Sequence, residues 1–282
     1  MQHHVLLNDL TFKQDDKLFP TSRRETAACK ESPSVSQSSN VYRNSPLESL
    51  RGCLIVSCQA SEGDPLDNLD TLTRIATSVL RGGAAGLRAE GVARIAAFRA
   101  ITQLPIIGLI KSYDTNGDVY ITPDFRSAKA ASDAGADIIA LDCTARRLAA
   151  AEPWPELIHR IHAELNRPVL ADIATLADAL AAERAGADAV ATTLYGYTAE
   201  TANLHTVSWP LIQSIAAHLT IPMLAEGHIT DPEDVRRALE LGATAVVVGS
   251  AITRPETITA RFVEAAHGLS KNDLARSKKT SV

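Results

Sequence analysis

Short apolar segments alternate with segments of helical period between residues 51 and 268 of this chain. The apolar segments are rich in Val, Ile and Ala and contain almost no alternating polar positions. Strands of this kind are buried on both faces, which is typical of a parallel sheet covered by helices. Eight segments have this character: 54–58, 85–88, 105–110, 138–141, 168–171, 189–193, 221–225 and 245–248. The pattern predicts repeated strand–helix units.

Glycines and capping residues mark the helix boundaries between these strands. Gly83, Gly135, Gly186 and Gly242 each stand shortly before a strand, where a glycine in the left-handed conformation commonly ends a helix. Asp231-Pro232 places a capping acid before a proline at the first helical position. Eight such units predict an α/β fold of the (β/α)8 TIM barrel type. An open doubly wound sheet is the alternative, but residues 58–63 lack the Gly-x-Gly-x-x-Gly turn that it commonly carries.

The flanks of the chain differ from this regular region. We expect residues 1–49 to form a flexible N-terminal leader, because residues 21–49 are rich in Ser, Asn, Thr and Glu and have no helical or strand period. The barrel is assigned to residues 50–268. Residues 269–282 carry several Lys and Arg residues and are expected to form a basic, solvated C-terminal tail.

Composition excludes several classes of protein. The 282 residues are 45% hydrophobic and 22% charged, which is ordinary globular composition. The 28 basic and 33 acidic residues argue against a nucleic-acid partner. No apolar run approaches the roughly 18 residues of a membrane-spanning helix, and the N-terminus has no signal-peptide core. The four cysteines lack Cys-x-x-Cys spacing and are interpreted as reduced thiols, which favours a cytoplasmic protein.

Almost every predicted strand ends in a polar or charged residue. These residues are Gln59, Arg88, Lys111, Asp142, Asp172, Thr193, Glu226 and the pair Gly249-Ser250. The carboxyl ends of barrel strands meet at one mouth, where such enzymes carry their chemistry. Charges of both signs can neutralise one another there, and a desolvated Lys111 can exchange a proton near neutral pH. The alternative is that strands simply end at polar residues because the following loops are exposed to solvent. It explains one or two of these residues but not the whole set.

The last two strand ends predict a phosphate site. Gly227 follows the seventh predicted strand, and Gly249-Ser250 with Arg254 follows the eighth. Barrels commonly bind phosphate at these two loops through backbone N–H groups, and Arg254 would add a charge-assisted contact. Ordinary helix caps are the alternative. Only His228 among the histidines lies close to a strand end, and no His/Cys cluster has zinc spacing, so neither a metal nor another cofactor is expected.

A series of motifs, in order along the chain, resembles the N-acylmannosamine-6-phosphate 2-epimerase family. The motifs are residues 52–60, 86–89, 105–111, 121–123, 137–142, 171–173, 192–198, 225–227 and 247–255. The resemblance covers roughly residues 50–267. It implies a metal-free, phosphate-binding barrel that interconverts N-acetylmannosamine 6-phosphate and N-acetylglucosamine 6-phosphate in sialic acid breakdown. The reaction removes and returns the proton at C2 of the open sugar.

The resemblance also implies roles for individual residues. Lys111 is expected to be the acid/base residue at C2, with Glu226 as its charged partner. The expected substrate-binding residues are Gln59, Arg88, Asp142, Asp172, Thr193 and Tyr197. The expected phosphate-binding residues are Gly227, His228, Gly249, Ser250 and Arg254. The expected partner is a small phosphorylated amino sugar, with neither nucleic acid nor membrane, and the family's frequent dimers imply a homodimer.

The chain departs from the family pattern at a few positions. Ser112 stands where many relatives have Arg after the catalytic Lys, and His228 stands where many have Arg or Asn. The segment 142–149 keeps Arg146 but has Leu148 and Ala149 where the family pattern has its second Arg and its Pro. Two other functions remain open. Another phosphosugar epimerase, such as a ribulose-phosphate 3-epimerase, would require His and Asp metal ligands at strand ends. A non-catalytic sugar-phosphate-binding barrel would tolerate loss of Lys111 and Glu226.

Overall fold

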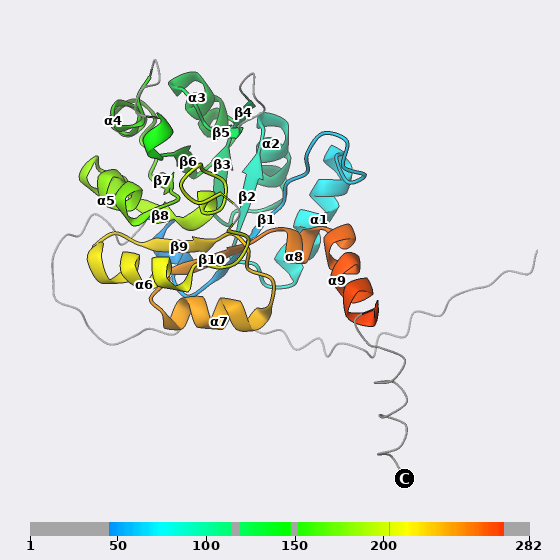
Figure 1. Ribbon diagram of the computed structural model, residues 1–282. Coiled ribbons are helices and arrows are strands. Elements are labelled where there is room, and N and C mark those ends of the chain that lie inside the picture. Colours follow the sequence, from blue (N-terminus) through cyan, green and yellow to red (C-terminus); the bar gives the residue numbers. More distant parts are fainter. Residues whose placement is uncertain (1–44, 114–118, 148–151, 203, 268–282) are drawn as a thin grey trace, which may run out of the picture. The chain divides into compact units, whose positions relative to one another are not determined.

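The computed structural model describes residues 45–113, 119–147, 152–202 and 204–267. Eight strands close into a barrel in the order β1-β10-β9-β8-β7-β6-β3-β2 (Figure 1), and all neighbouring strands within it pair in parallel. Their bounds are β1 Leu54–Ser57, β2 Gly86–Glu90, β3 Ile106–Leu109, β6 Ile138–Asp142, β7 Val169–Asp172, β8 Ala189–Ala191, β9 Met223–Glu226 and β10 Ala245–Val248. The predicted TIM barrel is confirmed, and each predicted segment supplies one barrel strand.

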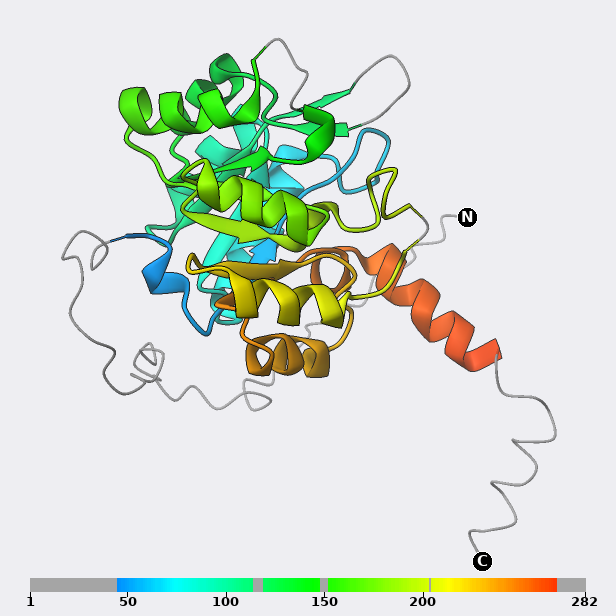
Figure 2. The ribbon, with the colours of Figure 1, turned by 60° about the vertical axis from the view of Figure 1, so that its left-hand side comes forward.

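Helices surround the barrel, and the last of them, α9 (Pro255–His267), extends away from it (Figures 1 and 2). They are α1 Leu69–Arg81, α2 Val92–Ile101, α3 Phe125–Asp133, α4 Trp154–Leu165, α5 Leu176–Arg184, α6 Trp209–His218, α7 Pro232–Glu240, α8 Ser250–Thr253 and α9 Pro255–His267. The predicted boundary signals lie where expected. Gly135 and Gly242 follow helices with φ of 107° and 103°. Asp231 forms a capping box with Asp234 at the start of α7, and Pro232 is the first helical residue.

Apolar side chains of the strands form two clusters. One contains Ile55, Ile107, Leu109, Ile138, Ala140, Leu170, Ala189, Ala191, Leu224, Ala245 and Val247. The other contains Val56, Leu87, Ala89, Ile106, Ile139, Leu141, Val169, Ala171, Val190, Ala225, Val246 and Val248, together with residues of the helices. Because successive side chains of a strand point to opposite faces, the first cluster fills the barrel and the second lies beneath the helices.

The segment before β1 packs against the barrel filling. It forms the short 3-10 helix η1, Glu48–Leu50, and both Leu47 and Leu50 are buried in the same cluster as Ile55. The rest of the predicted leader, residues 1–44, and the predicted tail, 269–282, lie outside the described residues. The domain boundaries therefore stay predictions.

An antiparallel hairpin follows β3 and was not predicted. Its strands are β4, Lys111–Tyr113, and β5, Val119–Ile121, and they form a separate two-stranded sheet. Lys111 was expected at the end of the third barrel strand, but it begins β4 instead. The hairpin starts at Ile110, whose carbonyl accepts a hydrogen bond from Thr122 N at 2.7 Å. Thr193 likewise lies just beyond its strand, in the 3-10 helix η3, Thr192–Leu194.

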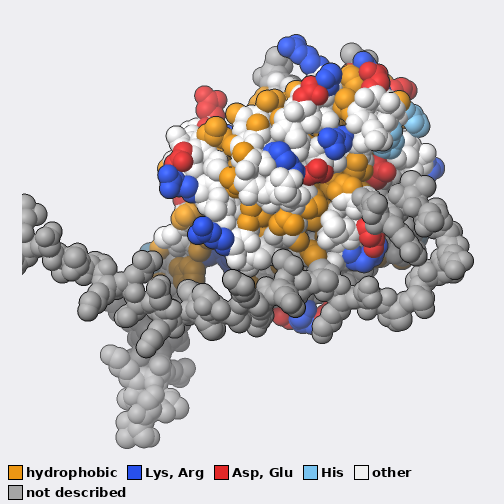
Figure 3. Space-filling model, turned by 180° about the vertical axis from the view of Figure 1, so that it is seen from behind, with side chains coloured by type: hydrophobic (Ala, Val, Ile, Leu, Met, Phe, Trp, Pro, Cys, Tyr) orange, Lys and Arg blue, Asp and Glu red, His pale blue; other side chains and the backbone are white. Residues whose placement is uncertain are grey.

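The surface carries charges of both signs. On the face seen in Figure 3, basic and acidic side chains are interspersed with hydrophobic ones rather than gathered by sign. This agrees with the near balance of 28 basic and 33 acidic residues. Within the described ranges, no helix has the length and apolar character needed to cross a membrane.

Candidate active site

The strand ends bring charged side chains to the inside of the barrel mouth. Arg88, Asp142, Asp172 and Glu226 all occupy strand positions that alternate with the helix-facing residues, so their side chains point into the barrel. Asp142 and Asp172 are direct neighbours in the β6–β7 register. The barrel therefore gathers residues that lie far apart in the sequence.

Arg88 reaches across the barrel to two carboxylates. Its Nη1 and Nη2 donate to Asp172 Oδ1 and Oδ2 at 3.0 and 2.7 Å, and Nη1 also donates to Glu226 Oε2 at 2.8 Å. The side chains of Arg88, Asp172 and Glu226 are 1%, 0% and 12% exposed. Burial opposes the charge of the guanidinium, but the two carboxylates together raise the pKa of Arg88. This ion cluster is shielded from water, so its interactions are strong.

Thr193 lies between the two carboxylates. Its Oγ1 is 2.5 Å from Asp172 Oδ1 and 3.1 Å from Glu226 Oε2. In the barrel order β8 stands between β7 and β9, so a residue just past β8 meets the ends of both neighbouring strands. Thr193 was predicted as a site residue. Its position between two acids depends on barrel closure, which no local pattern reveals.

Glu226 has a strongly perturbed titration. Burial raises the pKa of its carboxyl to about 7, with Arg88 opposing the shift and Asp172 adding to it. The charge of Lys111 opposes it further, and so would a hydrogen bond donated by Thr193 to an ionised Glu226. A carboxyl that titrates near neutral pH can both give and accept a proton in catalysis.

Lys111 is the second candidate for proton transfer. Burial lowers the pKa of its ammonium group, while nearby Glu90 raises it. The cations Arg88 and Arg254 lower it further, and Glu226 raises it. The net effect makes the neutral amine accessible closer to neutral pH than for a solvated lysine, which a general base requires.

Asp142 belongs to a different network from the Arg88 cluster. Its Oδ1 accepts from Thr144 Oγ1 at 2.6 Å and from Thr144 N at 3.1 Å, and its Oδ2 accepts from Arg146 Nη2 at 2.8 Å. The same Nη2 donates to Val119 O at 2.8 Å, and the guanidinium lies over the Tyr120 ring, 4.6 Å from its centroid. Asp142 and Arg146 therefore anchor the hairpin on which Lys111 lies. Arg146 was noted in the sequence as a retained family position, but its link to the hairpin was missed.

The predicted phosphate residues after β10 lie beside the end of β1. Ser250 begins α8, and a Cβ added to Gly249 would stand 3.4 Å from Ser57 Cβ. The Nη2 of Arg254 donates to the Gln59 carbonyl at 3.5 Å. The Gln59 side chain in turn donates to Ser57 Oγ at 2.9 Å. The loops after β1 and β10 thus form one side of the mouth.

His228 contacts the loop after η3. Its Nε2 lies 3.2 Å from the Tyr195 carbonyl, and its ring stacks on Tyr197 with centroids 5.7 Å apart. Gly227 and His228 have φ of 102° and 58°, so the chain turns sharply after Glu226. Tyr197 is 62% exposed. These contacts place His228 and Tyr197 together on the β8–β9 side of the mouth.

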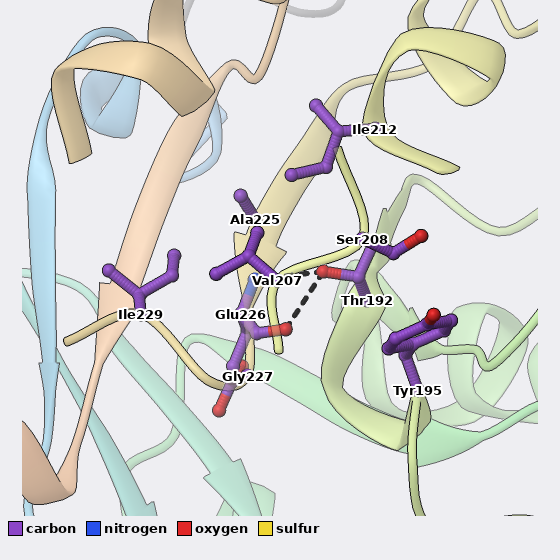
Figure 4. A pocket seen from close by; sticks show the side chains of 9 residues that line it. All are labelled: Thr192, Tyr195, Val207, Ser208, Ile212, Ala225, Glu226, Gly227 and Ile229. Atoms are coloured by element: carbon purple, nitrogen blue, oxygen red, sulfur yellow. Dashed lines mark hydrogen bonds between the residues drawn. The ribbon is translucent and has the colours of Figure 1, made fainter. Parts of the chain in front are cut away.

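A small pocket lies behind Glu226 (Figure 4). Its volume is about 10 Å³, enough for a water-sized occupant but far below a sugar phosphate. Thr192 points toward the Glu226 backbone here, and its Oγ1 donates to Glu226 O at 2.8 Å and accepts from Glu226 N at 3.0 Å. The sequence did not predict this role of Thr192, which fixes the position of the Glu226 backbone by two hydrogen bonds. In the part of the chain that the structure describes, no group of three or more His, Cys, Asp or Glu could hold a metal ion.

Comparison with known proteins gives consistent matches. A family model described as "Putative N-acetylmannosamine-6-phosphate epimerase" matches residues 72–268. A protein of Thermosynechococcus vestitus named "Putative N-acetylmannosamine-6-phosphate 2-epimerase" is 47% identical over 77% of this chain and 94% of its own length. A Clostridium perfringens protein of the same name is 40% identical over 77% of this chain and 98% of its own.

Solved structures agree with these matches. The structure titled as the N-acetylmannosamine-6-phosphate 2-epimerase from Clostridium perfringens superposes with a TM-score of 0.75 at 39% identity. The match covers 81% of this chain and 100% of that chain. A thiamine phosphate pyrophosphorylase from Pyrococcus furiosus matches with a TM-score of 0.52 at 18% identity, covering 75% of this chain and 90% of that one, and shows a shared fold alone.

Proposed function

Because the chain belongs to the N-acetylmannosamine-6-phosphate epimerase family, we propose that it interconverts N-acetylmannosamine 6-phosphate and N-acetylglucosamine 6-phosphate, a step of sialic acid breakdown. The observation that carries the proposal is that Lys111 and Glu226 lie close enough at one barrel mouth for the charge of each to shift the pKa of the other. The pKa of the lysine is lowered, and that of the carboxyl is raised to about 7. Both groups can therefore exchange protons near neutral pH.

The two sugars differ in configuration at C2, which is acidic when C1 is an open aldehyde. The neutral amine of Lys111 takes the C2 proton, and the electron pair of the broken C–H bond moves into an enolate on the C1 oxygen. The Lys111 ammonium group then gives a proton back to the opposite face of C2, the enolate electron pair forms the new C–H bond, and the product is the epimer. Glu226 assists by a second proton transfer, either to and from the sugar oxygen or to and from the Lys111 side chain. The cationic Arg88 stabilises the negative charge that develops.

We place the sugar against Gln59, Arg88, Asp142, Asp172, Thr193 and Tyr197. The Nε of Arg88 supports this assignment, because it is buried and makes no hydrogen bond among the described residues. Native proteins seldom leave such a donor unsatisfied, so an oxygen of the bound sugar is its expected acceptor. Asp142 and Asp172 are fully buried and would form the floor of the site.

We place the phosphate against Gly227, His228, Gly249, Ser250 and Arg254. The junction of β10 and α8 supports this placement, since Gly249 lets an anion approach the backbone closely. Arg254 supplies the cation; it also pairs with Asp64, 3.1 Å away. His228, in the loop after the neighbouring strand β9, would reach the anion from that side while it contacts the Tyr195 carbonyl.

The reaction we propose uses neither a metal nor another cofactor. Asp172 supports this view, because both its carboxylate oxygens accept hydrogen bonds from Arg88, whose positive charge opposes the binding of a metal cation at the same carboxylate. The residues that perform it lie between 50 and 268, flanked by the leader 1–49 and the tail 269–282.

We further propose a cytoplasmic homodimer. Cys58 and Cys143 are free thiols, which supports a reducing compartment.

Incubation with N-acetylmannosamine 6-phosphate tests this function. Proton NMR should show the signals of N-acetylglucosamine 6-phosphate growing to equilibrium, at a similar rate after treatment with a chelator. Ribulose 5-phosphate should remain unchanged, which separates this function from that of a 3-epimerase. Binding of N-acetylmannosamine 6-phosphate without any turnover would instead identify a non-catalytic sugar-phosphate-binding barrel and contradict the proposal.

A further inference from the structure

The hydroxyl of Thr193 faces two acids but has only one hydrogen. Its Oγ1 lies 2.5 Å from Asp172 Oδ1 and 3.1 Å from Glu226 Oε2. A hydroxyl donates once and accepts through its lone pairs, whereas an ionised carboxylate only accepts. Two ionised carboxylates therefore cannot both be satisfied by this one group.

Asp172 is the acid that receives the hydroxyl hydrogen. Arg88 binds it in a two-pronged ion pair, at 3.0 and 2.7 Å, which requires the ionised form. The 2.5 Å separation from Thr193 is in the range of hydrogen bonds between a hydroxyl and an anionic oxygen. The contact with Glu226 must then be made by a hydrogen that Glu226 carries itself.

Glu226 has the geometry to carry that hydrogen. Its Oε2 accepts from Arg88 Nη1 at 2.8 Å, which leaves the other lone-pair direction of the same oxygen for a proton aimed at Thr193. Arg88 and Asp172 already form a neutral buried pair. An ionised Glu226 would add a third buried charge whose compensation depends on Lys111, and burial lowers the pKa of that ammonium group. A protonated Glu226 leaves Arg88 and Asp172 as a neutral pair.

We propose that Thr193 is a positioning residue that holds Glu226 in its proton-bearing form in the substrate-free enzyme, by donating to Asp172 and accepting from Glu226. The charged groups facing Glu226 are Arg88 from β2, Asp172 from β7 and Lys111 from β4. The carboxyl pKa of about 7 agrees with a proton-bearing form near neutral pH.

The protonated state of Glu226 also affects Lys111 in the proposed reaction, and this part of the inference rests on the proposed function. An ionised Glu226 raises the pKa of Lys111, so a neutral Glu226 removes one of the carboxylates that oppose formation of the free amine. Thr193 would thereby help keep Lys111 ready to accept the C2 proton.

The test is an NMR titration of protein labelled with ¹³C in the glutamate side-chain carboxyl, without substrate. The Glu226 signal is identified by its absence from Glu226→Gln. In the wild type it should titrate near pH 7, and in Thr193→Val the midpoint should fall by about one pH unit, because the acceptor of the carboxyl proton is lost. Thr193→Ser keeps the hydroxyl, and its Glu226 carboxyl should titrate like that of the wild type. Thr193→Ala also removes the hydroxyl and replaces Thr193→Val in the test if the valine variant does not fold.

The sign of the shift decides the outcome. If Thr193 instead donates to an ionised Glu226, its removal would raise the midpoint, and that result or an unchanged midpoint would overturn the proposal. A wild-type midpoint below pH 5 would also overturn it. Because the titration needs no turnover, it stands apart from the failure or success of the epimerase assay. In active protein, the acidic limb of the kcat/KM profile follows deprotonation of Lys111. Because an ionised Glu226 raises the pKa of Lys111, Thr193→Val should also move this limb to higher pH.

Discussion

At the scale of single residues, the proposed chemistry depends on burial more than on residue type. Lys111 and Glu226 have shifted pKa values because the barrel removes them from water, and the largest cause of each shift is desolvation. Their identity as site residues was predictable, since a charge at the end of an apolar strand is conspicuous. Their partners were not predictable, because the contact of Arg88 with Glu226 joins positions that are 138 residues apart.

Glu226→Gln should change how stability depends on pH. The folded carboxyl titrates at about 7, above its ordinary value, so the folded state holds a proton that the unfolded chain has already released. Stability from this group is complete below about pH 4.5 and is lost as the pH rises through 7, by up to about 1.4 kcal/mol per pH unit. The glutamine variant does not titrate there. Its free energy of unfolding should therefore rise relative to the wild type between pH 5 and pH 8, as measured by denaturant unfolding.

Glu233→Gln is the matched control for this measurement. Glu233 is exposed on α7 and pairs with Arg236, whose hydrogen bond lowers the pKa of the carboxyl. Glu233 is therefore ionised throughout this pH range in both the folded and the unfolded state, and its replacement should give a small difference in stability that does not change between pH 5 and pH 8. A Glu226→Gln variant whose stability relative to the wild type does not rise with pH would show that the Glu226 carboxyl is already ionised at low pH.

Arg254→Ala should mainly weaken substrate binding. A charge-assisted contact to phosphate contributes about 1.5–3 kcal/mol, so KM should rise by about 10-fold to 100-fold while kcat changes much less. Arg261→Ala removes an exposed arginine that pairs with Asp231 on the neighbouring helix, and it should leave KM unchanged. Steady-state kinetics with N-acetylmannosamine 6-phosphate measures both. An unaltered KM in Arg254→Ala would place the phosphate elsewhere.

At the scale of elements, barrel strands were predictable and the hairpin was not. Strands such as β3 and β10 are apolar throughout because both faces are covered. Each therefore appears in the sequence as an apolar run without alternating polar residues. The strands β4 and β5 are only three residues each and are partly exposed, so Ser112 and Tyr120 show no recognisable period. The hairpin exists because β5 is held from the other side by Arg146, a tertiary contact that local sequence does not encode.

Arg146→Ala should therefore lower kcat more than it raises KM. The change removes the hydrogen bond to Val119 O and the contact with the Tyr120 ring, which frees the hairpin that carries Lys111. A base displaced by a fraction of an ångström loses reactivity, so we expect kcat to fall by about 10-fold or more. Arg126→Ala, an exposed arginine on α3, is the control and should behave like the wild type. Equal kcat values in the two variants would show that Arg146 does not position Lys111.

At the scale of the whole molecule, barrel closure creates the site. The strand order places β8 between β7 and β9 and opposite β2, which is why Arg88 meets Asp172 and Glu226 with Thr193 between them. Closure also leaves α9 outside the packing. None of the residues of α9 is buried, and the helix extends away from the barrel beyond α8 (Figure 2).

The exposed side of α9 is the surface that the proposed homodimer would bury. Phe262 and Val263 are 73% and 46% exposed, which is unusual for adjacent apolar side chains. Phe262→Glu should convert the dimer to a monomer, as measured by light scattering after size-exclusion chromatography. Thr257→Glu adds the same charge on the opposite side of the helix and should leave the mass unchanged. A wild-type protein that is monomeric at micromolar concentration, or a Phe262→Glu variant that stays dimeric, would refute this assignment.

The central claim is that the protein moves a proton at C2 through Lys111, and deuterium incorporation tests it most directly. The enzyme is incubated with N-acetylmannosamine 6-phosphate in D₂O, and C2 of the product is examined by NMR and mass spectrometry. The wild type should give N-acetylglucosamine 6-phosphate carrying deuterium at C2. Lys111→Ala should lose the exchange by about 10²-fold to 10⁴-fold, and Lys129→Ala, an exposed lysine paired with Asp133, should retain it. Product without deuterium at C2, or exchange in Lys111→Ala near the wild-type rate, would contradict the account.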